Sequence, residues 1–257
     1  MKIYHLLFAI TISFSCVGQS TSQKLSGVYQ WNQKAVKKSD GQEIKTFIKG
    51  PSTHFEMLDL HAVTLGSGGK LTHESNHEDM EEVIIVKEGL LQVTIDGKQN
   101  TLGPQGVVQL LPGKDHTFEN VGEENLAFYV MQYKSRKPVD MERGVSNGGS
   151  WVYNADSLIF KRSIKGGGRA YFDHSTAMCE RFEMHVTQLS AKGPSHAPHK
   201  HDETEIILMI SGKTDILIDG KKYKAKAGDF YFMDSGLMHG VSNIQDEPCT
   251  YFAFKWK

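Results

Sequence analysis

The chain has 257 residues, of which 29 are Lys or Arg and 30 are Asp or Glu, and no stretch concentrates charge of one sign. This balance argues against nucleic acids and anionic membranes as partners and favours a small-molecule substrate or ligand. A hydrophobic content of 39% with 25 Gly and 7 Pro indicates a globular, turn-rich protein with one large core or two small ones.

The first 18 residues have the pattern of a secretion signal peptide. Lys2 supplies a basic start, residues 6–14 form an apolar run, and small residues stand before Gln19. The run is too short to span a bilayer as a stable anchor. We therefore expect export to the periplasm or the extracellular space, with a lipoprotein anchored at Cys16 as the alternative.

Two cysteines remain in the expected mature chain, Cys179 and Cys249. Export makes a disulfide between them chemically feasible, but their positions in the sequence do not show that they meet. Two free, buried thiols are the other interpretation.

A single internal repeat divides the rest of the chain, and its two copies are offset by 123 residues. The matched positions are Glu82 to Gly89 with Glu205 to Gly212, Asp96-Gly97 with Asp219-Gly220, His116 with His239, and Asn120 with Asn243. Residues 146–150, rich in Gly, Ser and Asn, form the natural join. We predict an N-terminal domain at 19–145 and a C-terminal domain at 146–257.

Each copy consists of short apolar runs separated by turn residues. Residues 83–86 and 206–210 are runs that end at a glycine turn, and residues 91–95 and 215–218 lead into Asp-Gly turns typical of hairpins. No segment shows a sustained helical period with caps. The pattern predicts an all-β sandwich or barrel in each half.

The second copy contains a candidate metal site. His199 and His201 are two residues apart, so on a strand both point to one face; Glu205 begins the next strand, and His239 arrives from a later hairpin. Imidazole and carboxylate groups together suit one divalent transition metal: Mn, Fe, Ni, Cu or Zn. Glycines 212, 228 and 236 stand where tight turns require positive φ.

These residues occur in an order that resembles the two motifs of the cupin superfamily. The family pattern is Gly, His-x-His, Glu, Gly, followed by Gly, Pro-x-Gly, His, Asn. This chain matches it at Gly193, His199, His201, Glu205, Gly212, Gly228, Gly236, His239 and Asn243, with Asp234 in place of the Pro. The resemblance implies two tandem double-stranded β-helix barrels of the jelly-roll kind, a bicupin, and pairing of sheet edges in a homodimer.

The first copy departs from the same pattern. Ser75 stands where the first metal-binding His is expected, whereas His77, Glu82 and His116 remain, and His73 shares the strand face of His77. One interpretation is that this half has lost its metal and serves in packing. The alternative is a second metal site formed by His73, His77, Glu82 and His116.

An acid and a histidine also recur just before each motif, as Asp59-x-His61 and Glu183-x-His185. Alternation places the two members of each pair on one face of a strand. Glu183 and His185 are therefore candidates for an acid/base or substrate-orienting pair inside the barrel. A solvated outer face of the sheet is the other interpretation.

Three functions are compatible with this pattern. The first is a metal-dependent enzyme of the isomerase or lyase type acting on a small polar, carbohydrate-derived or carboxylate substrate. The second is a metal-dependent dioxygenase resembling the flavonol-cleaving bicupins, which use the same set of three His and one Glu. The third is a non-enzymatic protein that binds a sugar or an organic acid.

Overall fold

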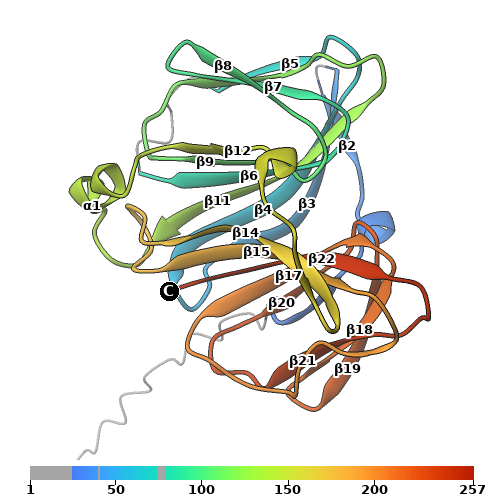
Figure 1. Ribbon diagram of the computed structural model, residues 1–257. Coiled ribbons are helices and arrows are strands. Elements are labelled where there is room, and N and C mark those ends of the chain that lie inside the picture. The colour runs from blue at the N-terminus through green and yellow to red at the C-terminus, as the bar shows by residue number, and fades with distance from the viewer. Residues whose placement is uncertain (1–24, 40, 74–78) are drawn as a thin grey trace, which may run out of the picture.

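The computed structural model describes residues 25–39, 41–73 and 79–257, and these form four antiparallel sheets. The predicted signal peptide, Ser75 and His77 lie outside the described residues. Each half contains one seven-stranded and one four-stranded sheet, which together make a barrel (Figure 1). The predicted all-β fold of two tandem barrels is confirmed.

The first barrel encloses one apolar core, which includes Val63, Leu91 and Phe118. Its larger sheet has the order β12 (Trp151–Tyr153), β9 (Val107–Leu110), β6 (Glu81–Glu88), β11 (Leu126–Ser135), β4 (Phe55–Leu65), β3 (Gln42–Gly50) and β2 (Lys37–Ser39). Its smaller sheet has the order β5 (Lys70–His73), β10 (His116–Asn120), β7 (Leu91–Ile95) and β8 (Lys98–Leu102).

The second barrel repeats this arrangement around a core that includes Ile207, Ile216 and Tyr251. Its larger sheet has the order β1 (Gly27–Tyr29), β20 (Phe230–Met233), β17 (Thr204–Ser211), β22 (Cys249–Trp256), β15 (Phe182–Leu189), β14 (Gly166–His174) and β13 (Lys161–Ser163). Its smaller sheet has the order β16 (Gly193–Pro194), β21 (His239–Asn243), β18 (Lys213–Ile218) and β19 (Lys221–Lys226).

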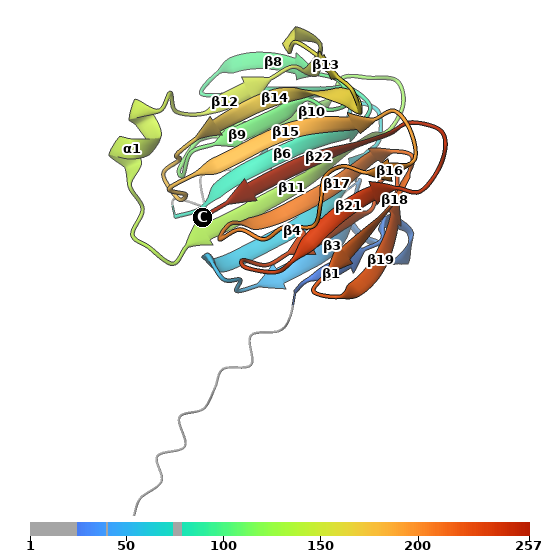
Figure 2. The ribbon, with the colours of Figure 1, turned by 60° about the horizontal axis from the view of Figure 1, so that its bottom comes forward.

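The two seven-stranded sheets pack against each other, with the smaller sheets on the far sides (Figures 1 and 2). A third and larger apolar core, which includes Leu60, Met131, Met184 and Phe254, draws side chains from both sheets. Strand alternation explains how one strand serves two cores, because Phe182 and Met184 of β15 face this shared core while Leu189 belongs to the interior of the second barrel. Alternate residues of β15 are therefore directed into the second barrel.

Two short strands cross between the halves of the chain. β1 pairs with β20 of the second barrel, although it precedes the whole first barrel in sequence. Conversely, β12 pairs with β9 of the first barrel, although it follows the predicted boundary after residue 145. The predicted domain division therefore differs from the sheets at these two strands, because each barrel borrows an edge strand from the other half.

The helical segments are short: α1 (Met141–Ser146), η1 (Trp31–Gln33) and η2 (Ala155–Ser157). Asp140 caps α1 by accepting a hydrogen bond from the backbone of Arg143. In the described part of the chain, no helix has the length and apolar character needed to cross a bilayer. Cys179 and Cys249 are both buried and free, in agreement with the interpretation as two thiols.

Candidate metal centre

Three histidines of the second barrel converge at one point. Candidate ligand atoms of His199, His201 and His239 all lie within 4.8 Å of one another. A pair of backbone hydrogen bonds holds the first and third together, because His199 N donates to the His239 carbonyl at 2.9 Å and His239 N donates to that of His199 at 2.8 Å. The predicted His-x-His motif and the later hairpin therefore meet in space.

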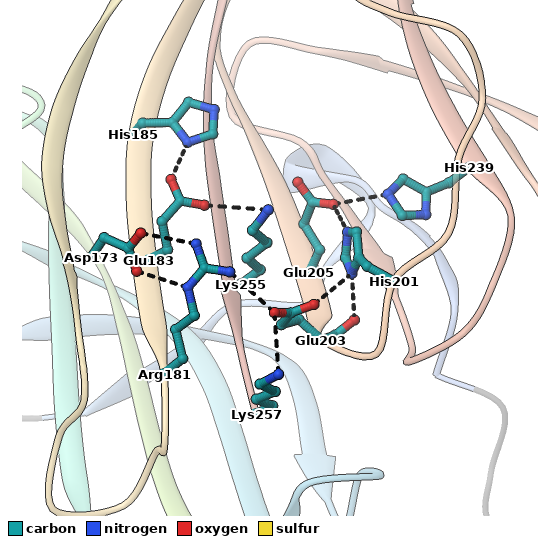
Figure 3. Close-up of polar contacts among 10 residues, drawn as sticks. All are labelled: Asp173, Arg181, Glu183, His185, His201, Glu203, Glu205, His239, Lys255 and Lys257. Atoms are coloured by element: carbon teal, nitrogen blue, oxygen red, sulfur yellow. Dashed lines mark hydrogen bonds and ion pairs between the residues drawn. The ribbon is translucent and has the colours of Figure 1, made fainter.

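Glu205 joins the three histidines from the large sheet. It lies on β17, is buried, and its Oε2 atom lies 2.9 Å from His239 Nε2 and 3.1 Å from His201 Nε2 (Figure 3). The structure thus brings all four residues of the predicted site together.

Backbone carbonyls orient two of the imidazoles. His201 Nδ1 lies 3.0 Å from the carbonyl oxygen of Glu203, and His239 Nδ1 lies 2.8 Å from that of Leu237. Since a carbonyl oxygen can only accept, each Nδ1 carries the proton and donates it. The Nε2 atoms are left facing Glu205, and a backbone partner on Nδ1 is the usual way in which proteins orient a metal-binding histidine.

The pKa values of His199 and Glu205 also suit a cation. Burial lowers the pKa of His199, and the neighbouring imidazoles of His239, His196 and His201 lower it further, so this ring is neutral near pH 7. Burial acts to raise the pKa of Glu205, but the adjoining imidazoles of His201 and His239 outweigh it and bring the pKa to about 2. A buried carboxylate beside converging imidazoles fits a divalent transition metal.

The Glu183–His185 pair lies on the wall of the same barrel. Glu183 on β15 and Glu205 on β17 both pair with Lys255 on β22, so all three share one face of the sheet. Glu183 Oε1 lies 2.5 Å from His185 Nδ1, and the Glu183 side chain is 14% exposed. This placement favours the interpretation as an interior pair over that of a solvated outer face.

Sequence reasoning missed Lys255. Its Nζ atom lies 3.6 Å from Glu183 Oε2, and its side chain is 24% exposed (Figure 3). The sequence pattern could have indicated it, because Tyr251, Ala253 and Lys255 are successive alternate residues of one strand and share a face, and the first two belong to the barrel core. Only the register across β22 shows that it stands between Glu183 and Glu205.

A band of ion pairs extends from this wall toward the rim. Arg181 contacts Asp173 at 2.8 Å and Glu203 at 3.2 Å, and Lys257 lies 3.9 Å from Glu203 (Figure 3). Glu203 also contacts His201 Nδ1 through its side chain at 3.5 Å. These ion pairs therefore support the candidate ligand His201 through its contact with Glu203.

The first barrel retains part of the corresponding set. Glu82 Oε2 lies 3.6 Å from His116 Nε2, and Gln132, the counterpart of Lys255, donates from Nε2 to Glu82 Oε1 at 3.0 Å. The backbone of His73 pairs with that of His116. A second metal at His73, His77, Glu82 and His116 stays a prediction, because His77 lies outside the described residues.

Comparison with known families identifies the architecture. A family model described as "Cupin domain" matches residues 61–132 and 186–255, which together make up more than half of the chain. The two matched segments fall in the two barrels and include the strands that carry Glu82 and Glu205.

The chain is also similar to individual proteins. The pectin degradation protein KdgF of Dickeya dadantii (strain 3937) is 37% identical over 57 residues, which is 22% of this chain and about half (52%) of that protein. AerE of Microcystis aeruginosa matches with a TM-score of 0.67 at 14% identity, over 87% of this chain and 97% of that chain. Bacillus subtilis oxalate decarboxylase, studied for its Mn(II) centres, matches with a TM-score of 0.63 at 15% identity, over 90% of this chain and 79% of that chain. The two solved structures show likeness of fold.

Proposed function

The chain belongs to the cupin family as a bicupin, and on this premise we propose that it is a metal-dependent enzyme acting on a small polar substrate that is carbohydrate-derived or carries a carboxylate. The proposed reaction is an isomerisation or a lyase reaction in the second barrel. The observation that carries the proposal is the convergence of His199, His201, Glu205 and His239 on one point.

The donor set is that of a reactive site rather than a closed structural one. Structural zinc sites are dominated by thiolates, whereas imidazole and carboxylate ligands are typical of sites that admit a substrate. A divalent metal held there would supply Lewis-acid polarisation of a substrate oxygen. The three histidines and Glu205 would hold it.

The Glu183–His185 pair would handle the proton in such a reaction. The bond between Glu183 Oε1 and His185 Nδ1 fixes the imidazole ring and leaves His185 Nε2 to accept or donate a proton. His185 is 38% exposed, so its ring is accessible to a small molecule, whereas Glu183 is mostly buried behind it. The two residues thus have different roles, one as proton carrier and one as its positioning residue.

The choice of substrate class is supported by the similarity to the pectin degradation protein of Dickeya dadantii. Pectin is a polymer of uronic acids, so a carbohydrate acid combines the two properties that the proposal names. Export through residues 1–18 is part of the same proposal, because polymeric plant material is met outside the cell. Amino-terminal sequencing of the protein from a fractionated cell tests the export.

The first experiment is elemental analysis of the mature chain purified without chelators, followed by anaerobic turnover assays with uronic acids. One transition metal per chain and oxygen-independent conversion of a uronic acid support the proposal. Turnover that requires oxygen would favour the dioxygenase. Thermal stabilisation by a sugar acid without turnover would favour the binding protein.

A further inference from the structure

Lys255 is placed beside the candidate metal centre by strand register. β22 lies between β15 and β17, and Lys255 is paired with Glu183 on one side and with Glu205 on the other. Tyr251 and Ala253, which precede it by four and two residues and share its face of the strand, are part of the core of the second barrel. The lysine side chain therefore projects from the inner wall, between the proposed proton-handling pair and the proposed metal ligands.

The ammonium group of Lys255 is incompletely paired for a side chain that is three-quarters buried. Its one carboxylate partner, Glu183, lies at 3.6 Å, which is longer than a hydrogen bond. Among the described residues, no acceptor lies within hydrogen-bonding distance of Nζ. An ammonium has three N–H donors, and Nζ is not among the buried atoms that lack a partner, so these donors face solvent and are free to bind an acceptor that enters the pocket.

The equivalent residue of the first barrel is paired differently. Gln132 donates from Nε2 to Glu82 Oε1 at 3.0 Å, so its side chain is committed to the glutamate of that barrel. In the second barrel, the partner of Lys255 is Glu183 instead, and Glu205 is bound by His201 and His239. The second barrel therefore has a cation, Lys255, at the position where the first barrel has the neutral Gln132.

The charged side chains on this wall predict the sign of the charge on the ligand. Two carboxylates, Glu183 and Glu205, and one ammonium, Lys255, sum to a single net negative charge. A divalent cation at the histidines reverses this to a single net positive charge. An anionic group on the substrate then neutralises the pocket, and Lys255 is the wall residue with donors available for it.

We infer that Lys255 recognises an anionic oxygen of the substrate, a carboxylate group, next to the metal held by the three histidines and Glu205. This inference rests on the proposed function and adds to it a specificity-determining residue. Lys255 binds the substrate acid, His185 and Glu183 face the reacting part of the molecule, and the substrate class narrows to carboxylates.

The test uses Lys255→Gln as its main variant, because a glutamine already stands at the equivalent position of the first barrel. Lys255→Met removes both the charge and the hydrogen bonds, and Lys255→Arg keeps the charge. Binding is measured by calorimetry on metal-loaded and on chelator-treated protein, with the metal content of each sample recorded. The probes are D-galacturonate with its uncharged counterpart D-galactose, together with pyruvate and oxalate.

The expected result is that wild-type protein binds a carboxylate probe, that Lys255→Gln and Lys255→Met weaken this binding about ten-fold or more, and that Lys255→Arg largely keeps it. Any weak binding of galactose is expected to be equal in all variants. Metal content is expected to be unchanged.

Equal carboxylate affinity in wild-type protein and in both neutral variants would overturn the inference, and so would a metal-loaded wild-type protein that binds none of the three acids. Failure of the proposed function can be told apart from failure of this inference, because wild-type protein would then take up no metal. In that case a carboxylate preference that depends on Lys255 in the metal-free protein would still support the inference.

Discussion

Asp59 and His61 are joined by a contact of 2.8 Å between Oδ1 and Nδ1, and the second barrel repeats this relationship in Glu183 and His185. In the first barrel a lysine completes the group, because Lys49 Nζ lies 3.0 Å from Asp59 Oδ2. The acid–imidazole pair is thus a property of the repeated fold, present in both barrels.

The pair predicts a dependence of stability on pH. Burial acts to raise the pKa of Asp59, but hydrogen bonds from His61 and Lys49 outweigh it and hold the pKa below its ordinary value of 3.8. A carboxyl group with a lowered pKa in the folded state stabilises the fold above its unfolded pKa, and this contribution is lost as the pH falls through the folded pKa. We expect Asp59→Asn to cost about 1 to 2 kcal/mol at pH 7 and progressively less below pH 4.

Urea unfolding at pH 3, 4, 5 and 7 checks this prediction. Glu180→Gln is the control, because Glu180 is exposed and its ion pair with Lys137 is solvent-screened. A constant difference between wild type and Asp59→Asn across the whole range would contradict the prediction.

The candidate metal centre predicts a sharp contrast between neighbouring histidines. His199→Ala and Glu205→Ala are expected to lower metal affinity by more than about 100-fold, because each removes a ligand rather than an outer partner. His196 is the matched control, since its ring centroid lies 4.4 Å from that of His199 but it is not among the converging ligands. We expect His196→Ala to keep the metal, and His77→Ala to have at most a minor effect. Metal analysis by mass spectrometry measures both, and equal loss from His77→Ala would show that the first barrel also binds metal.

The repeat and the motif spacing predicted much of this molecule for a physical reason. Glycines at 212, 228 and 236 have φ of 77°, 87° and 76°, so the sequence pattern recorded backbone conformations that other residues rarely adopt. Features set by local geometry were therefore accessible from the sequence. The predicted shared strand face of His199 and His201 differs from the structure, because His199 forms only an isolated bridge with His239 and His201 lies outside the strands.

The features that escaped prediction depend on long-range register. Lys255 has an ordinary place in an alternating strand, and its neighbours Glu183 and Glu205 become visible only when β15 and β17 are paired with β22. The exchanged strands β1 and β12 have three residues each, too few to show a period. Nothing local to them indicates which barrel they join.

The exchanged strand β1 makes the second barrel dependent on the start of the described chain. The Tyr29 ring stacks on Phe230 of β20, with 4.9 Å between ring centroids and 8° between planes. Tyr29→Ala is expected to cost about 2 to 4 kcal/mol, and hydrogen exchange at residues 230–233 is expected to accelerate. Tyr29→Phe is the control, because it removes only the hydroxyl that donates to the Leu25 carbonyl and should cost about 1 kcal/mol. Unchanged exchange in Tyr29→Ala would mean that β1 does not support β20.

The turns after β17 and β18 offer a matched pair of glycines, which separates backbone strain from steric overlap. Gly212 and Gly220 have nearly equal φ, 77° and 78°, so alanine carries a similar conformational cost of about 1 to 2 kcal/mol at either position. A Cβ at Gly212 would lie 2.7 Å from Cys249 Cβ and 2.8 Å from Cys249 Cα, whereas a Cβ at Gly220 would meet nothing within 4 Å. Since Cys249 begins β22, relief of this overlap would require the strand that carries Lys255 to move.

We therefore expect Gly212→Ala to destabilise the protein by at least about 2 kcal/mol more than Gly220→Ala, because overpacking adds to the strain that both variants share. Free energies of unfolding from urea titrations with tryptophan fluorescence measure the difference. Equal losses of unfolding free energy in the two variants would show that β22 can move away from residue 212 without an energetic penalty. The rigid placement of Lys255 between Glu183 and Glu205 would then need another explanation.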